Sequence, residues 1–131
     1  MRGPDTRAVD TNVLVRLLVR DDPRQVEAAE ELIRLGAWIS HQVLLETNWV
    51  LDSVYEVPPE RIAASMALLL DHRCLSVQDP EVVRAAVALF QERPSLGFSD
   101  CLILEVARKA GHLPLATFDR DLAKVEGAQR L

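Results

Sequence analysis

The sequence contains no long apolar segment. A helix that crosses a bilayer needs about 18 or more consecutive apolar residues, and no run in this chain approaches that length. The opening residues, Met-Arg-Gly-Pro-Asp-Thr-Arg, also lack the hydrophobic centre of a secretory signal. We therefore expect a cytoplasmic protein that makes no contact with a membrane.

Cysteines are few, and linker-like segments and excess positive charge are lacking. Cys74 and Cys101 form no C-x-x-C pair, so burial as small hydrophobic side chains explains them better than a zinc site or a disulfide. No stretch rich in Gly, Ser or Pro divides the chain and no repeat recurs, so we expect a single domain over residues 1–131. The net charge of -5 argues against a broad nucleic-acid-binding surface, although a few basic side chains around one cleft are enough to position a strand.

The chain does contain short β-type runs that alternate with longer runs of helical period. This alternation is typical of an α/β domain with a mainly parallel sheet. The expected strands are 7–9, 37–40, 74–77, 114–117 and 128–131. The expected helices are 13–19, 23–35, 42–54, 59–70, 80–91, 99–110 and a short one at 120–124.

Two acidic residues directly follow expected strands. Asp10 follows the first strand, and Asp119 follows the fourth. In open α/β sheets, ligands bind beyond the carboxyl ends of the strands, and this rule places both acids at the functional edge. Each residue also suits the N-cap of the helix that follows it. Judged alone, this structural explanation is as good as a functional one for Asp10, and better for Asp119.

Two further acids lie within expected helices. A helical projection puts Glu46 about 40° from Val50, and it puts Asp100 about 40° from Leu104, so each acid is expected beside an apolar face. A buried ionised carboxylate is costly without a cation or strong hydrogen bonds, so Glu46 needs a local partner or a metal. An interaction with the helix dipole explains an acid in the first turn, but not the alignment of Asp100 with the apolar stripe.

The four acids are more informative together than singly. Two like charges about 4 Å apart repel by about 4 kcal/mol at an effective dielectric constant near 20, so four converging carboxylates cannot all stay ionised without help. Protons or divalent cations must neutralise them, and all-oxygen ligands suit Mg²⁺ or Mn²⁺. A common use of such a site is to hold a phosphodiester, activate water and stabilise the leaving oxygen.

The sequence resembles the PIN-domain family, and most closely its VapC-type toxin ribonucleases. The resemblance covers nearly the whole chain and follows the family's order of motifs. The matching segments are Val-Asp-Thr-Asn-Val-Leu at 9–14, Glu46 in an apolar helix, Ser-Asp-Cys-Leu-Ile at 99–103 and Thr-Phe-Asp at 117–119. Cys101 stands where the family usually has alanine, and the extension through Thr6 has no assigned role.

The resemblance implies a Rossmann-like three-layer α/β/α fold with a five-stranded parallel sheet, and a Mg²⁺- or Mn²⁺-dependent endoribonuclease. It implies four metal-binding acids, with Asp10 and Asp100 as principal ligands and Glu46 and Asp119 acting directly or through water. Asn12 and Thr117 match supporting polar positions, and Asp121 is a further candidate acid. The family also implies a homodimer and, for toxins, a VapB-type antitoxin protein that covers the cleft.

Other functions fit parts of the pattern. A catalytically silent PIN-like interaction module would use the acids to bind a partner's arginines. A PIN-type nuclease that acts on another nucleic acid, outside a toxin–antitoxin system, stays open because metal and phosphate chemistry does not read the 2′-hydroxyl of RNA. A phosphatase with an aspartate nucleophile fits poorly, because Asn12 stands where that pattern requires a second acid.

The source of positive charge for RNA binding is not evident from the sequence. Three basic residues lie close in sequence to the proposed acids, namely Arg16, Arg20 and Arg120. The net negative charge of the chain gives no indication of which of them contacts a substrate.

Overall fold

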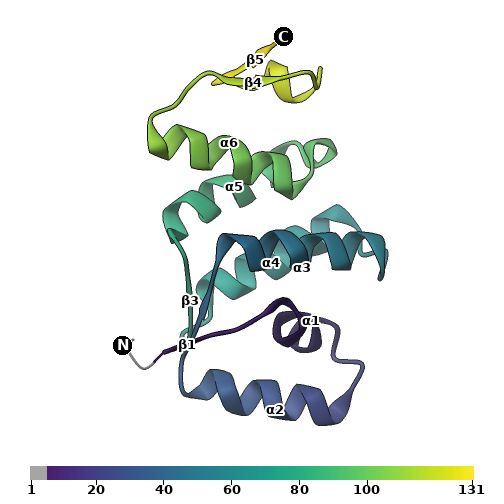
Figure 1. The fold of residues 1–131 in the computed structure, drawn as a ribbon. Helices are drawn as coiled ribbons and strands as arrows, with labels where there is room; N and C mark the ends of the chain where they lie inside the picture. The colour runs from purple at the N-terminus through teal and green to yellow at the C-terminus, as the bar shows by residue number, and fades with distance from the viewer. Residues whose placement is uncertain (1–5) are drawn as a thin grey trace. The chain divides into compact units, whose positions relative to one another are not determined.

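The computed structural model describes residues 6–131, and the chain divides into two compact units, residues 1–80 and 81–131. Figure 1 colours the first unit purple to teal and the second teal-green to yellow. Most of the extension through Thr6 lies outside the described residues. No helix in the described part of the chain is long and apolar enough to cross a membrane.

The first unit contains a small parallel sheet and four helices. In chain order its elements are β1 (Arg7–Ala8), α1 (Thr11–Val19), α2 (Pro23–Arg34), β2 (Ala37–Ile39), α3 (His41–Ser53), α4 (Pro59–Asp71) and β3 (Leu75–Val77). The strands are ordered β1-β2-β3, with Ala37 of β2 paired to Arg7 on one side and Leu75 on the other. Because the strands are parallel, β1 and β2 end at the same edge of the sheet, and α1 and α3 follow from that edge.

The helices of the first unit begin at residues that satisfy free backbone amides. Side-chain oxygens of Asp10, Asp22 and Ser40 accept hydrogen bonds from amides three residues further on, at the starts of α1, α2 and α3. α2 and α4 begin with Pro23 and Pro59, because proline has the φ angle of a first helical turn and needs no donor partner there. These local effects fix where the elements around the sheet edge begin.

The packing of the first unit is mainly aliphatic. α1 packs against α2 and α3, and α4 packs against α3 and β3. In Figure 1, α1 is the dark purple helix and α2 is the blue helix next to it. Fully buried side chains include Leu14, Ile39, Leu44 and Met66. Burial of one such side chain contributes about 1.5 to 3 kcal/mol relative to exposure. Because the strands have only two or three residues, this packing does most to hold the strand ends in place.

The second unit contains two long helices and a short parallel pair of strands. Its elements are α5 (Pro80–Glu92), which starts at the boundary, η1 (Pro94–Leu96), α6 (Phe98–Ala110), β4 (Leu115–Thr117), η2 (Leu122–Lys124) and β5 (Ala128–Arg130). Phe90 and Phe98 pack edge to face, with ring centroids 6.2 Å apart. Arg108 of α6 donates to the carbonyl oxygen of Glu126 at 2.7 Å. These contacts tie α6 to the α5 end and to the turn before β5.

The predicted secondary structure is confirmed. All five strands and all seven helical segments are present, with ends shifted by at most two residues, and the α/β class is therefore confirmed. The predicted short helix at 120–124 is a 3₁₀ turn, and the 3₁₀ turn Pro94–Leu96 was not predicted.

The predicted pairing of the strands is not confirmed. In the described residues, backbone hydrogen bonds join β1, β2 and β3 in one sheet and β4 with β5 in another, rather than all five strands in one. Strand pairing depends on tertiary packing, which local sequence patterns do not encode. The three-layer arrangement and the single domain over residues 1–131 stay predictions.

Candidate functional site

Two of the four predicted acids line one open pocket in the first unit. Asp10, from the end of β1, and Glu46, from α3, border a cavity of about 440 Å³. The lining residues are Asp10, Thr11, Asn12, Val15, Arg16, Glu46, Val50, Val54 and Tyr55. The predicted supporting residue Asn12 is therefore at the same pocket as the two acids.

Asp10 is both an N-cap and a pocket residue. The preceding residue, Val9, continues the contact with β2 by donating its amide to the carbonyl oxygen of Trp38 at 3.1 Å. Oδ1 of Asp10 accepts from the amide of Val13 at 3.3 Å and so caps α1. The structural explanation of Asp10 is thus correct, and it is compatible with metal binding because the cap uses only one carboxylate oxygen.

Glu46 has the local partner that the sequence analysis required, but it does not face the core. Its Oε1 accepts a hydrogen bond from the hydroxyl of Thr11 at 2.6 Å, and its side chain is exposed at the pocket. The buried stripe of α3 consists of Leu44, Thr47 and Leu51. The expectation that Glu46 lies beside a buried apolar face was wrong. Val50, its expected neighbour on that face, lines the pocket, and the core position next to Glu46 is occupied by Thr47.

The other two predicted acids are neighbours within the second unit. Asp100 lies in the first turn of α6 and is half-buried, whereas the adjacent Cys101 is fully buried. Burial raises the pKa of Asp100 above its ordinary value, and the negative charge of Asp119 raises it further. The predicted inward position of Asp100 is supported, because Leu104 on the same helix face is completely buried.

Asp119 organises the turn after β4. Its Oδ1 accepts hydrogen bonds from the amides of Asp121 and Leu122 at 2.8 and 2.9 Å, while its own amide donates to the hydroxyl of Thr117 at 3.0 Å. Asp121 is exposed and lies 3.9 Å from Lys124. The N-cap position of η2 is Asp121 rather than Asp119, so the N-cap explanation holds only in that Asp119 accepts from the amides that lead into η2. Thr117 acts as a supporting residue for the turn that presents Asp119.

The structure thus brings the predicted acids together in two pairs, one in each unit. Asp10 and Glu46 line the same pocket, and the negative charge of Asp119 contributes to the raised pKa of Asp100. Within residues 6–131, no three His, Cys, Asp or Glu side chains are grouped as a metal site. The convergence of all four acids on one site stays a prediction.

The two pairs have the chemistry that a hard divalent cation requires. Mg²⁺ is usually held through one or two carboxylates, with water and substrate phosphates as the remaining ligands. The hydrogen bonds to Asp10 and Glu46 engage one oxygen of each, so the second oxygen of each is available as a ligand within the described residues. Burial and, to a smaller extent, the negative charge of Asp119 raise the pKa of Asp100, and a bound cation would offset that charge.

The group formed by Arg16, Tyr55 and Asp21 at this pocket was not predicted from the sequence. Arg16 donates to Asp21 and, at 3.4 Å, to the hydroxyl of Tyr55, which in turn donates to Asp21 at 3.2 Å. The bond with Tyr55 raises the pKa of Arg16; hydrogen bonds from Tyr55 and Arg16 lower the pKa of Asp21 despite the opposing effect of burial. Spacing contained one indication, since Arg16 lies four residues after Asn12 on α1.

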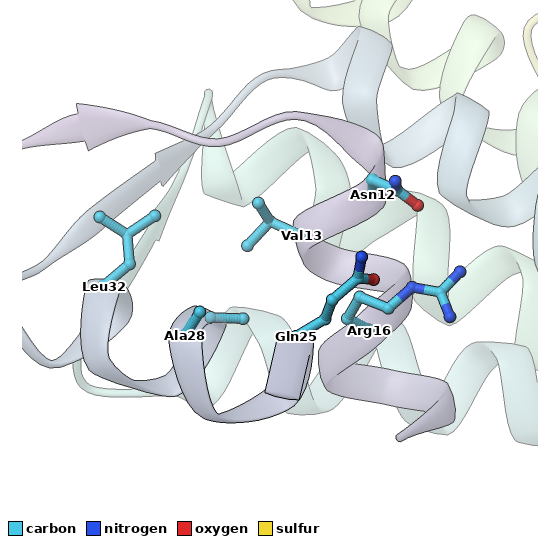
Figure 2. A pocket seen from close by; sticks show the side chains of 7 residues that line it. Asn12, Val13, Arg16, Gln25, Ala28 and Leu32 are labelled. Carbon is cyan, nitrogen blue, oxygen red and sulfur yellow. The ribbon is translucent and has the colours of Figure 1, made fainter. Parts of the chain in front are cut away.

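Arg16 and Asn12 also border a second, mainly apolar pocket between α1 and α2, with a volume of about 300 Å³. Figure 2 shows Asn12, Arg16 and Gln25 gathered at one end of this pocket, with Ala28 and Leu32 at the other. The two pockets therefore share the polar residues of α1. Arg20, by contrast, pairs with Glu30 at 3.0 Å and does not line the acidic pocket.

Comparison with known proteins assigns a family. A family model for the PIN domain matches residues 7–128, which include all four acids and their supporting residues. No curated protein gives a significant match to the chain.

Proposed function

The chain belongs to the PIN-domain family, whose members generally have the fold and activity of nucleases, and on that premise we propose that it is a Mg²⁺- or Mn²⁺-dependent endoribonuclease. The observation that carries the proposal is the pocket where Asp10 and Glu46 meet at the edge of a parallel sheet. PIN nucleases act on nucleic acids and generally use divalent metals, which agrees with these carboxylate ligands. The choice of RNA rests on the resemblance to VapC-type ribonucleases.

Each acid has a defined task in the proposed reaction. Asp10 and Asp100 would be the principal metal ligands, and Glu46 and Asp119 would complete the acidic site directly or through water. The bound cation would activate a water for attack on the phosphodiester and offset the charge on the leaving oxygen. The remaining residues act on these ligands: the cap on α1 fixes Asp10, and the hydroxyl of Thr11 orients Glu46.

The second pair is presented by residues of its own unit. The amides after Asp119 hold its Oδ1, which leaves its other carboxylate oxygen as a candidate ligand. Thr117 fixes the backbone of this turn through the amide of Asp119. Asn12 contributes an amide side chain beside Asp10, and Asp121 adds negative charge near Asp119.

We further propose that the protein is the toxin of a VapBC-type pair, with a VapB-type antitoxin as its partner and a homodimer as its assembly. The resemblance at residues 9–14 and 99–103 supports this assignment. A short antitoxin-like reading frame directly upstream would support the toxin assignment.

Metal removal tests the proposed activity. The purified protein is expected to cleave single-stranded RNA with Mg²⁺ or Mn²⁺, to stop when EDTA is added, and to resume when excess metal is restored. The measurement is the rate of cleavage of a labelled RNA on a denaturing gel, with a DNA of the same sequence as the comparison. Equal cleavage of the DNA would contradict the assignment to RNA, and cleavage that persists in EDTA would contradict the role of the metal.

The hydrogen bond between Thr11 and Glu46 gives a second prediction. Thr11→Val removes the hydroxyl that orients Glu46, and loss of a group that orients a metal ligand lowers activity by about 10- to 100-fold. Thr11→Ser retains the hydroxyl and is expected to keep most of the activity. Both variants are compared by kcat on the same RNA, and equal activity of the valine and serine variants would contradict this role of Thr11.

A further inference from the structure

Within residues 6–131, the acidic pocket of the first unit contains a single basic side chain. Arg16 is the only lysine or arginine among the nine residues that line it. A nucleic-acid strand is a polyanion, and proteins hold its phosphates mainly with lysine and arginine. Asp10 and Glu46 add negative charge to the same pocket, so a strand bound there needs a positive group beside them. Arg16 has the right charge and position.

The guanidinium of Arg16 is held in one orientation by two neighbours. Nη1 donates to Oδ1 of Asp21 and Nη2 donates to the hydroxyl of Tyr55, while that hydroxyl donates to Oδ2 of Asp21. These hydrogen bonds form a closed ring that links α1, the segment that follows α1 and the segment that follows α3. The orientation of the guanidinium is therefore set before any ligand binds.

Arg16 retains hydrogen-bonding capacity beyond this ring. A guanidinium carries five N–H donors, and the ring uses two of them. Its Nε is buried and has no hydrogen-bond partner in the described residues. One N–H on each of Nη1 and Nη2 also lies outside the ring. A fixed arginine with free donors suits the oxygens of a phosphate.

We propose that Arg16 is an RNA-binding residue that holds a phosphate of the bound strand, other than the one cleaved, in the pocket of Asp10 and Glu46. Asp21 and Tyr55 are positioning residues that set the direction of its guanidinium. This inference rests on the proposed function and adds the side chain that binds the substrate. The competing explanation is that Arg16 only links α1 to its neighbours, which predicts an effect on stability and none on RNA binding.

The salt dependence of RNA binding separates the two explanations. Binding of a labelled single-stranded RNA is measured by fluorescence anisotropy in the Asp10→Asn background, where the RNA is not cleaved, at a series of salt concentrations. Arg16→Gln is expected to weaken binding about tenfold, because hydrogen bonds to charged groups are the strong ones. Loss of one phosphate contact should also reduce the slope of log K against log salt by about 0.7.

Matched variants separate charge, geometry and position. Arg61 is exposed on α4 and does not line the acidic pocket, so Arg61→Gln is expected to leave both the affinity and the slope unchanged. Arg16→Lys keeps the charge but loses the planar fork, so it should restore the slope and only part of the affinity. Tyr55→Phe should weaken binding by a smaller factor, because Asp21 still holds the guanidinium.

Steady-state cleavage gives an independent measurement. In the background with Asp10 intact, Arg16→Gln is expected to raise KM about tenfold and to change kcat less than about threefold, as for a residue that binds substrate and transition state alike. Thermal melting identifies any variant that does not fold. If Arg16→Gln is unfolded, the comparison uses Arg16→Lys and Tyr55→Phe, and parental RNA affinity in both would overturn the proposal.

The outcomes also separate this inference from the proposed function. If the parent binds and cleaves RNA but Arg16→Gln keeps the parental slope and KM, the inference fails and the proposed function stands. If the wild-type protein neither binds nor cleaves RNA, both fail. A reduced slope together with a raised KM for Arg16→Gln, and neither change for Arg61→Gln, supports the assignment.

Discussion

Asp10→Asn is expected to lower the rate of RNA cleavage about 1,000-fold or more, as is typical when a principal catalytic group is lost, while the protein keeps its fold. The substitution removes the negative charge that binds the cation. It retains a side-chain oxygen for the cap on α1, because asparagine is as good an N-cap as aspartate. The measurement is the single-turnover cleavage rate with saturating Mn²⁺, combined with circular dichroism to check the fold.

The chain contains a matched control for this substitution. Asp22 caps α2 in the way that Asp10 caps α1, by accepting from the amide of Gln25 at 3.2 Å, and it does not line the acidic pocket. Asp22→Asn should therefore change neither the fold nor the cleavage rate. Full activity of a folded Asp10→Asn variant would contradict the assignment of Asp10, and an equal loss in both variants would trace the effect to the caps.

Asp100→Asn is expected to abolish cleavage to a similar extent and, unlike most substitutions that inactivate an enzyme, to stabilise the metal-free protein near pH 7. Partial burial, followed by the charge of Asp119, raises the pKa of Asp100. A carboxyl group whose pKa is raised on folding holds its proton more tightly in the folded protein than in the unfolded chain. Its ionised form therefore lowers the free energy of unfolding at neutral pH.

The pH dependence of this effect has a definite sign. The penalty from Asp100 is fully present above its raised pKa, and it disappears as the pH falls below the ordinary value of about 3.9. Asparagine is neutral at every pH, so the substitution should raise Tm near pH 7 and have little effect near pH 3. Solvent screens a partly exposed carboxylate, so the expected rise is only about 1 to 2 °C.

Differential scanning calorimetry in EDTA measures this shift. Asp52→Asn serves as the control, because Asp52 is exposed on α3 and does not line the acidic pocket. It should change neither Tm nor cleavage. A fall in Tm for Asp100→Asn at pH 7 would contradict the argument from charge repulsion, and retained cleavage would remove Asp100 from the catalytic set.

The secondary structure was predictable because the relevant interactions are local. The caps at Asp10, Asp22 and Ser40, and the prolines that open α2 and α4, lie within a few residues of the amides and φ angles that they affect. The pairing of strands depends on contacts between distant segments. Short segments such as β4, with three residues, contain too little sequence to indicate their neighbour.

The candidate site was only partly predictable for a related reason. Strand-end position identified Asp10 and Asp119 as candidates, and helical spacing identified Asp100. Spacing misplaced Glu46, because Val50 lines the pocket with Glu46, while the buried face of α3 consists of Leu44, Thr47 and Leu51. The link from Arg16 to Tyr55 joins residues 39 positions apart, which no local pattern shows.

Calorimetric titration with Mn²⁺ tests the proposed function most directly, namely the proposal that Asp10 and Asp100 are both ligands of the catalytic cation. The wild-type protein should bind Mn²⁺, and Asp10→Asn and Asp100→Asn should each lose that same binding event while remaining folded. Wild-type affinity in either variant would contradict a shared site. A wild-type protein that binds no Mn²⁺ would contradict the metal-dependent nuclease and favour a module that only binds a partner.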